Sequence, residues 1–170
     1  CDDIVRCTET MGFNAAKVST MGGHMVSMPN IRSNERVIWH TDQSWMKQLN
    51  CRLLPLLQRP EVADLLPDWI PYSLNERLRI FKYTKGQEFK KHFDGGFAKT
   101  WVDRSHMTFI AYLGTPEEGG HTGFYNSNSR IEIVTVPPTK GSALIFFHEG
   151  HALSPLHSGL PVERGTKYAL

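Results

Sequence analysis

The sequence has few cysteines: Cys1, Cys7 and Cys51 are the only three among 170 residues, and no two of them form a Cys-x-x-Cys pair. An odd number without such spacing argues against a disulfide scaffold and against a zinc knuckle. Because disulfides persist mainly in oxidising environments, this usage favours the cytoplasm or another reducing compartment.

Long hydrophobic runs and a strong charge of one sign are also missing. No apolar run reaches the roughly 18 residues that a membrane-spanning helix needs, so we expect no membrane partner. The 19 Lys and Arg residues nearly balance the 17 Asp and Glu residues, for a net charge of +2. This balance makes nucleic acid an unfavoured partner. No pattern indicates an oligomeric state.

The length and the absence of repeats, linkers and low-complexity tracts predict a single domain over residues 1–170. The first residue is not Met, and the last residues read as part of a strand. Both ends are therefore expected to be trimmed, so the lack of a signal peptide decides little about the compartment.

Residues 1–72 are expected to supply a helical support. Apolar side chains recur at helical spacing within residues 4–12, and the segment ends on a glycine. Thr41-Asp42 can cap a second helix, which carries Trp and Leu at core spacing and continues to Pro60. Between the two helices, Gly22-Gly23 predicts a turn.

From residue 73 onward the hydrophobic period changes to two. Short apolar runs are separated by Gly and Pro turns, with no helical pattern between them. This pattern predicts an all-β sandwich or barrel over residues 73–170, with the N-terminal helices against one face. The runs that read as strands are residues 77–83, 107–113, 121–125, 131–136, 142–147, 156–157 and 166–170.

Two metal-binding side chains, His92 and Asp94, stand one residue apart after an alternating segment. On a β-strand, residues i and i+2 project from the same face, so the imidazole and the carboxylate can bind one ion together. A distant histidine would complete the 2-His-1-carboxylate triad of non-haem Fe(II) oxygenases. The pair alone is weak, because the same spacing also occurs at ordinary exposed strand ends.

Three C-terminal histidines compete to be the third ligand: His148, His151 and His157. A 2-oxo acid cosubstrate needs a cation about one short hairpin from the metal, to hold its far carboxylate. Only His157 is followed ten residues later by a lysine, Lys167, across a glycine-containing turn. We therefore predict His157 as the ligand and interpret the other two as loop or surface histidines.

Four motifs, in this order and spacing, resemble the catalytic domain of prolyl 4-hydroxylases, a branch of the Fe(II)/2-oxoglutarate-dependent dioxygenases. The resemblance covers the chain from about residue 73 to its end. Arg32-x-Asn34-x-Arg36 and the helix after it also resemble small stand-alone bacterial and fungal members. The four motifs are Tyr83-x-x-Gly86-x-x-Phe89-x-x-His92-x-Asp94, Glu118-Gly-Gly-x-Thr122, Lys140-Gly-x-Ala-Leu-Ile-Phe146 and His157-x-Gly-x-Pro-Val-x-x-Gly-x-Lys167.

The resemblance implies a double-stranded β-helix, or jelly roll, with His92, Asp94 and His157 as iron ligands. It implies Fe(II) as the metal, 2-oxoglutarate as the cosubstrate and ascorbate as a reductant. In the implied reaction, a C–H bond is hydroxylated while 2-oxoglutarate and O₂ become succinate and CO₂. The implied target is a prolyl residue in a peptide or protein.

The resemblance also assigns residues to the cosubstrate. Lys167 is expected to form a salt bridge with its C5 carboxylate, while Tyr83 and Thr122 hydrogen-bond the same molecule. Tyr112 is a weaker candidate for that role. Taken singly, these residues read as a solvated lysine, a strand-forming threonine and two core aromatics with satisfied hydroxyls.

Arg79 is a candidate for contact with the substrate. If Tyr83 faces the interior, strand alternation places Arg79 on the same side, near the mouth of the barrel. The basic residues within 77–91 can equally form a solvated strand edge that is balanced by Glu76 and Glu88.

Other functions remain open, because fold and family do not determine the substrate. A free amino acid or another small molecule could be hydroxylated instead. Oxidation or demethylation of nucleic acid is favoured only by the basic segment. A non-catalytic jelly-roll binding module is disfavoured, since all three candidate ligands occur together with Lys167.

Overall fold

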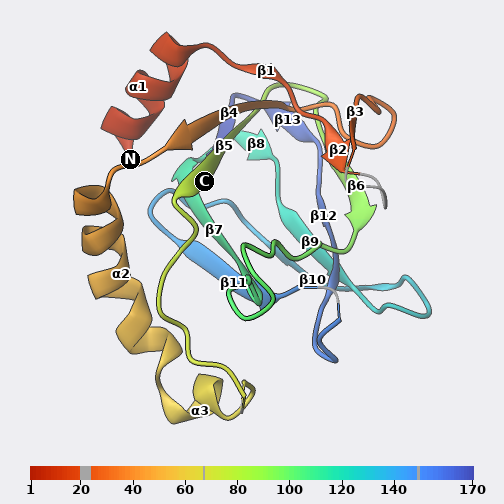
Figure 1. Ribbon diagram of the computed structural model, residues 1–170. Helices are drawn as coiled ribbons and strands as arrows, with labels where there is room; N and C mark the ends of the chain where they lie inside the picture. Colours follow the sequence, from red (N-terminus) through yellow and green to blue (C-terminus); the bar gives the residue numbers. More distant parts are fainter. Residues whose placement is uncertain (20–23, 67, 149) are drawn as a thin grey trace. The chain divides into compact units, whose positions relative to one another are not determined.

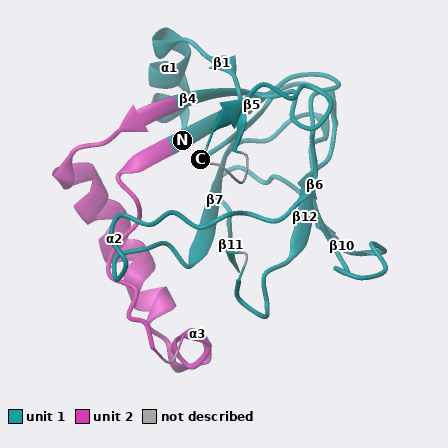
Figure 2. Cartoon of the chain, turned by 45° about the vertical axis from the view of Figure 1, so that its right-hand side comes forward, with its two compact units in different colours: residues 1–37, 79–170 teal, residues 38–78 magenta. Residues whose placement is uncertain are grey.

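The computed structural model describes residues 1–19, 24–66, 68–148 and 150–170. The turn predicted at Gly22-Gly23 lies outside these residues. The chain divides into two compact units, residues 1–37 with 79–170 and residues 38–78, which are coloured separately in Figure 2.

Most strands of the chain belong to two sheets (Figure 1). The six-stranded sheet has the order β1-β4-β5-β14-β7-β11, and the four-stranded sheet has the order β10-β9-β12-β6. Two small sheets pair β13 with β8 and β2 with β3. This mainly β architecture with N-terminal helices was predicted and is confirmed. The strands are β1 (Asn14–Ala15), β2 (Val18–Ser19), β3 (Met25–Val26), β4 (Glu35–His40), β5 (Arg77–Tyr83), β6 (Phe89–His92), β7 (Met107–Gly114), β8 (Glu118–Gly119), β9 (Thr122–Tyr125), β10 (Glu132–Val136), β11 (Ala143–Phe147), β12 (Leu156–Gly159), β13 (Val162–Arg164) and β14 (Lys167–Ala169).

Side chains between the two sheets form the core of the larger unit. The hydroxyl of Tyr112 on β7 lies 2.6 Å from Oγ1 of Thr122 on β9. The ring of Phe146 on β11 lies 4.6 Å from the ring of His157 on β12, measured between centroids. These contacts cross from one sheet to the other, so the chemistry-bearing residues of both sheets face the same interior.

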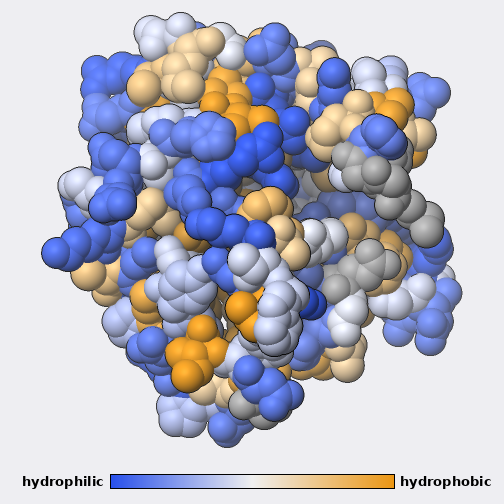
Figure 3. Space-filling model, in the orientation of Figure 1, coloured by the Kyte–Doolittle hydropathy of each residue, from blue (hydrophilic) through white to orange (hydrophobic). Residues whose placement is uncertain are grey.

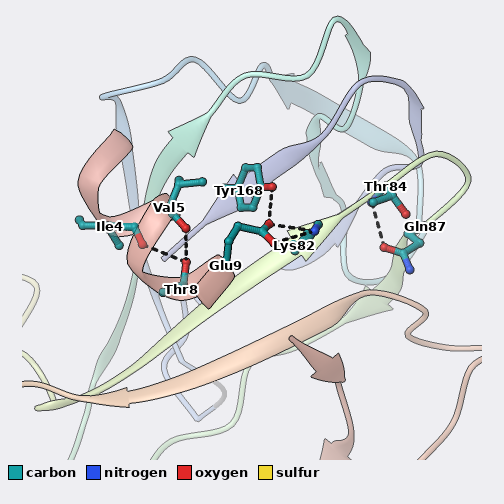
Figure 4. Close-up of polar contacts among 8 residues, drawn as sticks. All are labelled: Ile4, Val5, Thr8, Glu9, Lys82, Thr84, Gln87 and Tyr168. Carbon is teal, nitrogen blue, oxygen red and sulfur yellow. Dashed lines mark hydrogen bonds and ion pairs between the residues drawn. The ribbon is translucent and has the colours of Figure 1, made fainter. Parts of the chain in front are cut away.

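Glu9 of helix α1 (Asp2–Met11) bonds to two strands of the six-stranded sheet (Figure 4). Glu9 Oε1 lies 2.8 Å from Nζ of Lys82 on β5 and accepts a 2.6 Å hydrogen bond from the hydroxyl of Tyr168 on β14. Inside the helix, the Thr8 hydroxyl donates to the carbonyls of Ile4 and Val5. The predicted helix is confirmed, and Glu9 joins it to two strands.

We expect Glu9→Gln to lower the free energy of unfolding by about 0.5–1 kcal/mol at pH 7, since this ion pair is partly exposed. The hydrogen bonds from Lys82 and Tyr168 lower the pKa of Glu9. A carboxyl whose pKa is lowered by folding stabilises the folded state above its unfolded pKa and loses that contribution as the pH falls through its folded pKa. Urea unfolding should therefore show the full difference at pH 7 and a shrinking difference as the pH falls below the ordinary glutamate pKa of about 4.3.

The matched control for this experiment is Glu132→Gln, because Glu132 is exposed on β10. An equal loss of stability in both variants, or a Glu9→Gln effect that persists at low pH, would show that the carboxylate does not attach α1 to the sheet.

The smaller unit contains helices α2 (Gln43–Leu57) and α3 (Pro60–Ala63). As predicted, Asp42 caps α2, and its carboxylate accepts a 2.8 Å hydrogen bond from the backbone N–H of Trp45. Pro60 was predicted to end this helix, but α2 ends at Leu57 and Pro60 is the first residue of α3. A proline fits there because the first N–H groups of a helix have no intrahelical acceptor. The subdivision into residues 1–72 and 73–170 stays a prediction.

On the face shown in Figure 3, apolar residues form separate patches among hydrophilic ones. Within the described ranges, no helix combines the length and the apolar character needed to cross a membrane.

Candidate metal centre and cosubstrate site

Three side chains predicted as metal ligands lie together between the sheets. One ligand atom from each of His92, Asp94 and His157 falls within 4.8 Å of the other two. His157 on β12 is the direct register partner of His92 on β6, so antiparallel pairing places the two imidazoles side by side. Asp94 follows His92 at i+2. Nε2 of His92 is 3.4 Å from Asp94 Oδ1, and Nε2 of His157 is 3.7 Å from Asp94 Oδ2.

Backbone carbonyls orient both imidazoles. Nδ1 of His92 lies 2.7 Å from the carbonyl oxygen of Lys90, and Nδ1 of His157 lies 3.2 Å from that of Pro155. A carbonyl only accepts, so Nδ1 carries the proton and donates, which leaves the Nε2 lone pair directed at Asp94. This is how protein histidines are prepared to bind a metal.

The carboxylate of Asp94 is held ionised and in place. The Thr108 hydroxyl on β7 donates a 2.7 Å hydrogen bond to its Oδ2. Burial alone raises the pKa of Asp94, but the imidazoles of His92 and His157 and the Thr108 hydroxyl, all close to the carboxylate, together hold this pKa well below its usual range. Burial lowers the pKa of His157, against the charge of Asp94, and so favours the neutral imidazole. Deprotonated ligands of this kind are the forms that bind a metal.

The cluster is closed on one side and open on another. The side chain of His157 is only 5% exposed, whereas those of His92 and Asp94 are 18% and 27% exposed. An ion held here would therefore be protected at His157 and accessible beside Asp94. This donor set of two imidazoles and one carboxylate fits non-haem Fe(II).

The residues predicted to bind the cosubstrate lie in the interior, close to the three clustered ligands. Lys167, Tyr83, Tyr112 and Thr122 are all buried. Nζ of Lys167 lies 5.2 Å from the ring centroid of Tyr83 and 5.4 Å from that of Tyr112. The charge of Asp94 acts on Tyr83, so the two groups of residues are neighbours.

Lys167 is a buried cation without a compensating carboxylate among the described residues. Nζ donates a 2.7 Å hydrogen bond to the carbonyl oxygen of Gly120. Burial lowers the pKa of Lys167 to about 8, and no neighbouring charge opposes this shift. A cation this deep in the fold favours an anionic ligand, because a buried charge is costly until it is paired.

The Glu118-Gly-Gly motif shapes the wall beside Lys167. Gly119 and Gly120 have φ values of 78° and 71°, which side chains rarely adopt. A Cβ on Gly119 would lie 2.5 Å from the Pro161 carbonyl oxygen, closer than any real contact. Glycine at these positions lets the backbone turn under Lys167 and present the Gly120 carbonyl to it.

The hairpin that was predicted to return Lys167 beside His157 is wrong. The intervening strand β13 pairs with β8, and β14 lies between β5 and β7 in the other sheet. Lys167 is the register partner of Tyr83. The lysine thus reaches the interior from the sheet opposite His157, because the chain crosses between the sheets after β12.

Two other histidines and one arginine that the sequence analysis considered are not among the clustered ligands. His151 stacks on the ring of Phe147 at 3.8 Å, away from the three clustered ligands. His148 lies in the loop directly after β11, and both of its ring nitrogens are buried and lack hydrogen-bond partners in the described part of the chain. Arg79 is exposed on β5, the strand that carries Tyr83, and its contact with a substrate stays a prediction.

Sequence reasoning gave no role to Thr108 and Arg32. Thr108 is a polar residue in the apolar run that forms β7, and this break in the pattern was its only signal. Arg32 was noted only as part of a motif. The charge of Arg32 acts on both Tyr83 and Asp94, so it also belongs to the site.

Two facing β-sheets with a His-x-Asp and a distant His between them define the double-stranded β-helix class of metal-binding folds. Residues 78–170, more than half of the chain, match the 2OG-Fe(II) oxygenase superfamily. The chain belongs to this family.

Among curated proteins, the chain is similar to prolyl 4-hydroxylase 2 of Arabidopsis thaliana, with 29% identity over 133 residues, which covers 64% of this chain and 44% of the relative. The chain thus spans less than half of that protein.

Among solved structures, it resembles the viral collagen prolyl hydroxylase vCPH from Paramecium Bursaria Chlorella virus-1 in complex with 2OG. That match has 22% identity and a TM-score of 0.63, and it covers 99% of this chain and 85% of the other. The prolyl hydroxylase of Trichoplax adhaerens, solved with a hypoxia inducible factor peptide fragment, has 17% identity and a TM-score of 0.59 over 99% and 72%. At these identities the two structures support the fold.

Proposed function

We propose that this chain is the catalytic domain of an Fe(II)/2-oxoglutarate-dependent dioxygenase that hydroxylates a prolyl residue in a peptide or protein. The observation that carries the proposal is the cluster of His92, Asp94 and His157 with the buried, uncompensated Lys167 nearby. The first three residues fit Fe(II), and the lysine fits a dicarboxylate such as 2-oxoglutarate.

Each residue of the site has a proposed task. His92, Asp94 and His157 bind the iron on one face through Nε2 and carboxylate oxygens. Lys167 pairs with the C5 carboxylate of 2-oxoglutarate, and its buried position keeps water away from that pair. Iron with 2-oxoglutarate bound supplies the oxidation of a C–H bond by O₂, with succinate and CO₂ as the other products.

The hydroxyl-bearing residues complete the cosubstrate site. Tyr83 is proposed to hydrogen-bond the cosubstrate beside Lys167. Thr122 and Tyr112 share one hydrogen bond, so one of the two hydroxyls keeps its proton for the ligand. Arg79, exposed at the start of the strand that carries Tyr83, is proposed to contact the peptide.

The names of the similar proteins support a prolyl target, since they include a collagen prolyl hydroxylase and a prolyl hydroxylase solved with a peptide. The alternative target is a free amino acid or another small molecule.

The test is incubation of the protein with Fe(II), 2-oxoglutarate, ascorbate and a panel of proline-containing peptides. We expect a peptide product heavier by one oxygen atom, formed in step with succinate, and a hydroxyl on the proline ring by fragmentation. Asp94→Ala is the control and should form neither product.

Succinate formation with free amino acids but with no peptide would show that the substrate is a small molecule instead of a peptide. No succinate with any compound, from folded protein that binds iron, would favour a non-catalytic binding module.

A further inference from the structure

Arg32 belongs to a stack of planar side chains that ends on His92, one of the candidate metal ligands. Its Cζ lies over the ring of Phe81 at 4.5 Å and over the ring of Phe89 at 4.2 Å. Phe89 in turn stacks on the imidazole of His92, with ring centroids 3.5 Å apart and planes 21° from parallel. The Phe89 ring therefore contacts both the guanidinium and the imidazole, and it transmits the position of one to the other.

An irregularity in strand pairing allows Phe89 and His92 to stack. Side chains three residues apart normally project from opposite faces of a strand. Here His157 pairs with His92 while Gly159 pairs with Phe89, so that two residue steps on β12 are opposite three on β6. An extra residue of this kind redirects the side chains of its strand. Both rings thus come to the same side of β6.

Backbone contacts hold Arg32 beside the same strand. Arg32 pairs with Phe89 in an isolated antiparallel bridge. Next to this bridge, the N–H of Ser33 donates to the carbonyl oxygen of Glu88 at 3.1 Å, and the Ser33 hydroxyl accepts from the N–H of Glu88 at 2.9 Å. These contacts place the Arg32 side chain at the Phe89 ring.

A buried amide fixes the guanidinium in that place. Nε of Arg32 donates a 2.8 Å hydrogen bond to Oδ1 of Asn34. Asn34 is 1% exposed, and its Nδ2 donates to the carbonyl oxygen of Glu35 at 3.0 Å. Because two phenylalanine rings and this amide all contact it, the guanidinium has little freedom to move away from Phe89.

The N-terminal segment also holds the backbone group that orients His92. The N–H of Lys90 donates a 2.9 Å hydrogen bond to the carbonyl oxygen of Ile31. The carbonyl oxygen of Lys90 lies 2.7 Å from Nδ1 of His92. The imidazole is therefore held at its face by Phe89 and at its edge by Lys90, and residues 31 and 32 contact both of these supports.

We propose that Arg32 is a positioning residue for the metal centre. By holding the Phe89 ring against the imidazole of His92, it keeps Nε2 of His92 directed at the metal. The inference rests on the proposed function, which places Fe(II) at His92. A ligand that is already oriented loses less freedom when the metal binds, so its support raises the metal affinity. Arg32 lies outside residues 78–170, the part that matches the family, so the N-terminal segment completes the metal centre.

The test is a double-mutant cycle on the affinity for Fe(II). Anaerobic equilibrium dialysis without 2-oxoglutarate gives a dissociation constant for wild type, Arg32→Met, Phe89→Leu and the double variant. We expect each single variant to bind Fe(II) about tenfold more weakly, as for other residues that orient a metal ligand. The double variant should be little weaker than either single one, because Arg32 acts through Phe89.

Two further readouts respond to the orientation of His92 and not to stability alone. Phe89→Tyr keeps the aromatic ring and should keep the wild-type affinity, in contrast to Phe89→Leu. The visible ligand-field spectrum of the Co(II)-loaded protein reports the geometry of the ligands, and it should change in Arg32→Met and stay the same in Phe89→Tyr.

The controls separate positioning from general damage. Circular dichroism confirms the fold of each variant. Arg32→Lys keeps the charge but lacks the planar group, so it should also weaken Fe(II) binding, and it serves if Arg32→Met does not fold. Arg164→Met is the matched control, because Arg164 is an exposed arginine that pairs with Glu117 and should leave the affinity unchanged.

The outcomes distinguish this inference from the function on which it rests. Arg32 variants that lose stability but keep the wild-type Fe(II) affinity overturn the role of Arg32 alone, and so do losses that multiply in the double variant. A protein whose Fe(II) affinity depends on Arg32 but which forms no succinate overturns the proposed function and supports the inference. A folded wild-type protein that binds no Fe(II) overturns both.

Discussion

We expect His157→Ala to abolish the visible charge-transfer band that the wild-type protein should give when Fe(II) and 2-oxoglutarate are added without oxygen. His157 is the most buried of the three clustered ligands, and its Nε2 faces Asp94 Oδ2 at 3.7 Å. Removing it leaves one imidazole and one carboxylate, too few to hold the ion on one face. Since loss of an outer hydrogen-bond partner alone costs 10–100-fold, the iron affinity should fall at least about a hundredfold.

The measurement is an anaerobic titration of metal-free protein, with iron binding followed separately by equilibrium dialysis. His151→Ala is the matched control, because His151 was the competing candidate and stacks on Phe147 outside the cluster. It should keep the band and the iron affinity. A band that survives in His157→Ala and disappears in His151→Ala would show that the wrong histidine is assigned to the metal.

We expect Lys167→Met to stabilise the metal-free protein while it weakens 2-oxoglutarate binding. Burial lowers the pKa of Lys167 from its ordinary value of 10.5 to about 8. At neutral pH this corresponds to a cost of about 3 kcal/mol to the folded state. Methionine has nearly the same length and carries no charge. Allowing for the Gly120 carbonyl that loses its donor, we expect a net gain of about 1–2 kcal/mol in the free energy of unfolding.

The pH dependence of this gain has a definite sign. The unfolded chain keeps the lysine protonated up to about 10.5, whereas the folded chain releases the proton near pH 8. Between these values the unfolded state binds more protons, so the stability of the wild type rises with pH through this window. The advantage of Lys167→Met should therefore be largest below pH 8 and should shrink toward pH 10. Denaturant unfolding at pH 7 and pH 9.5 measures it.

The same substitution should weaken the binding of 2-oxoglutarate by about 2–4 kcal/mol, because the buried C5 carboxylate loses its partner. In the wild type, affinity should fall as the pH rises above about 8, where the free lysine is neutral and must take up a proton on binding. Lys85→Met, on the nearby surface, is the control. A near-normal Michaelis constant for 2-oxoglutarate in Lys167→Met would remove the lysine from the cosubstrate site.

The sequence predicted correctly those elements that depend only on residues close together in the chain. The alternating run of residues 77–83 is β5, residue for residue, because side-chain alternation is a property of a single strand. Asp42 capping α2 is likewise a contact three residues along the chain. The strands β1, β2, β3, β8 and β13 were missed, since two or three residues cannot display a period. The strand β4 was also missed, although it has six residues.

In the candidate site, the sequence by itself indicated that His92 and Asp94 can bind one ion together and that the chain carries the motifs of its family. The predicted strand is shorter than expected, because β6 ends at His92 and Asp94 lies just beyond it. The tertiary structure decided what lies opposite them. His157 meets His92 through β-sheet register, and Lys167 arrives from the other sheet as the partner of Tyr83. The guanidinium of Arg32 lies over the rings of Phe81 and Phe89, far from it in the sequence. Spacing along a chain describes neighbours within an element, whereas pairing between distant strands depends on how whole sheets pack, and only the folded chain shows that.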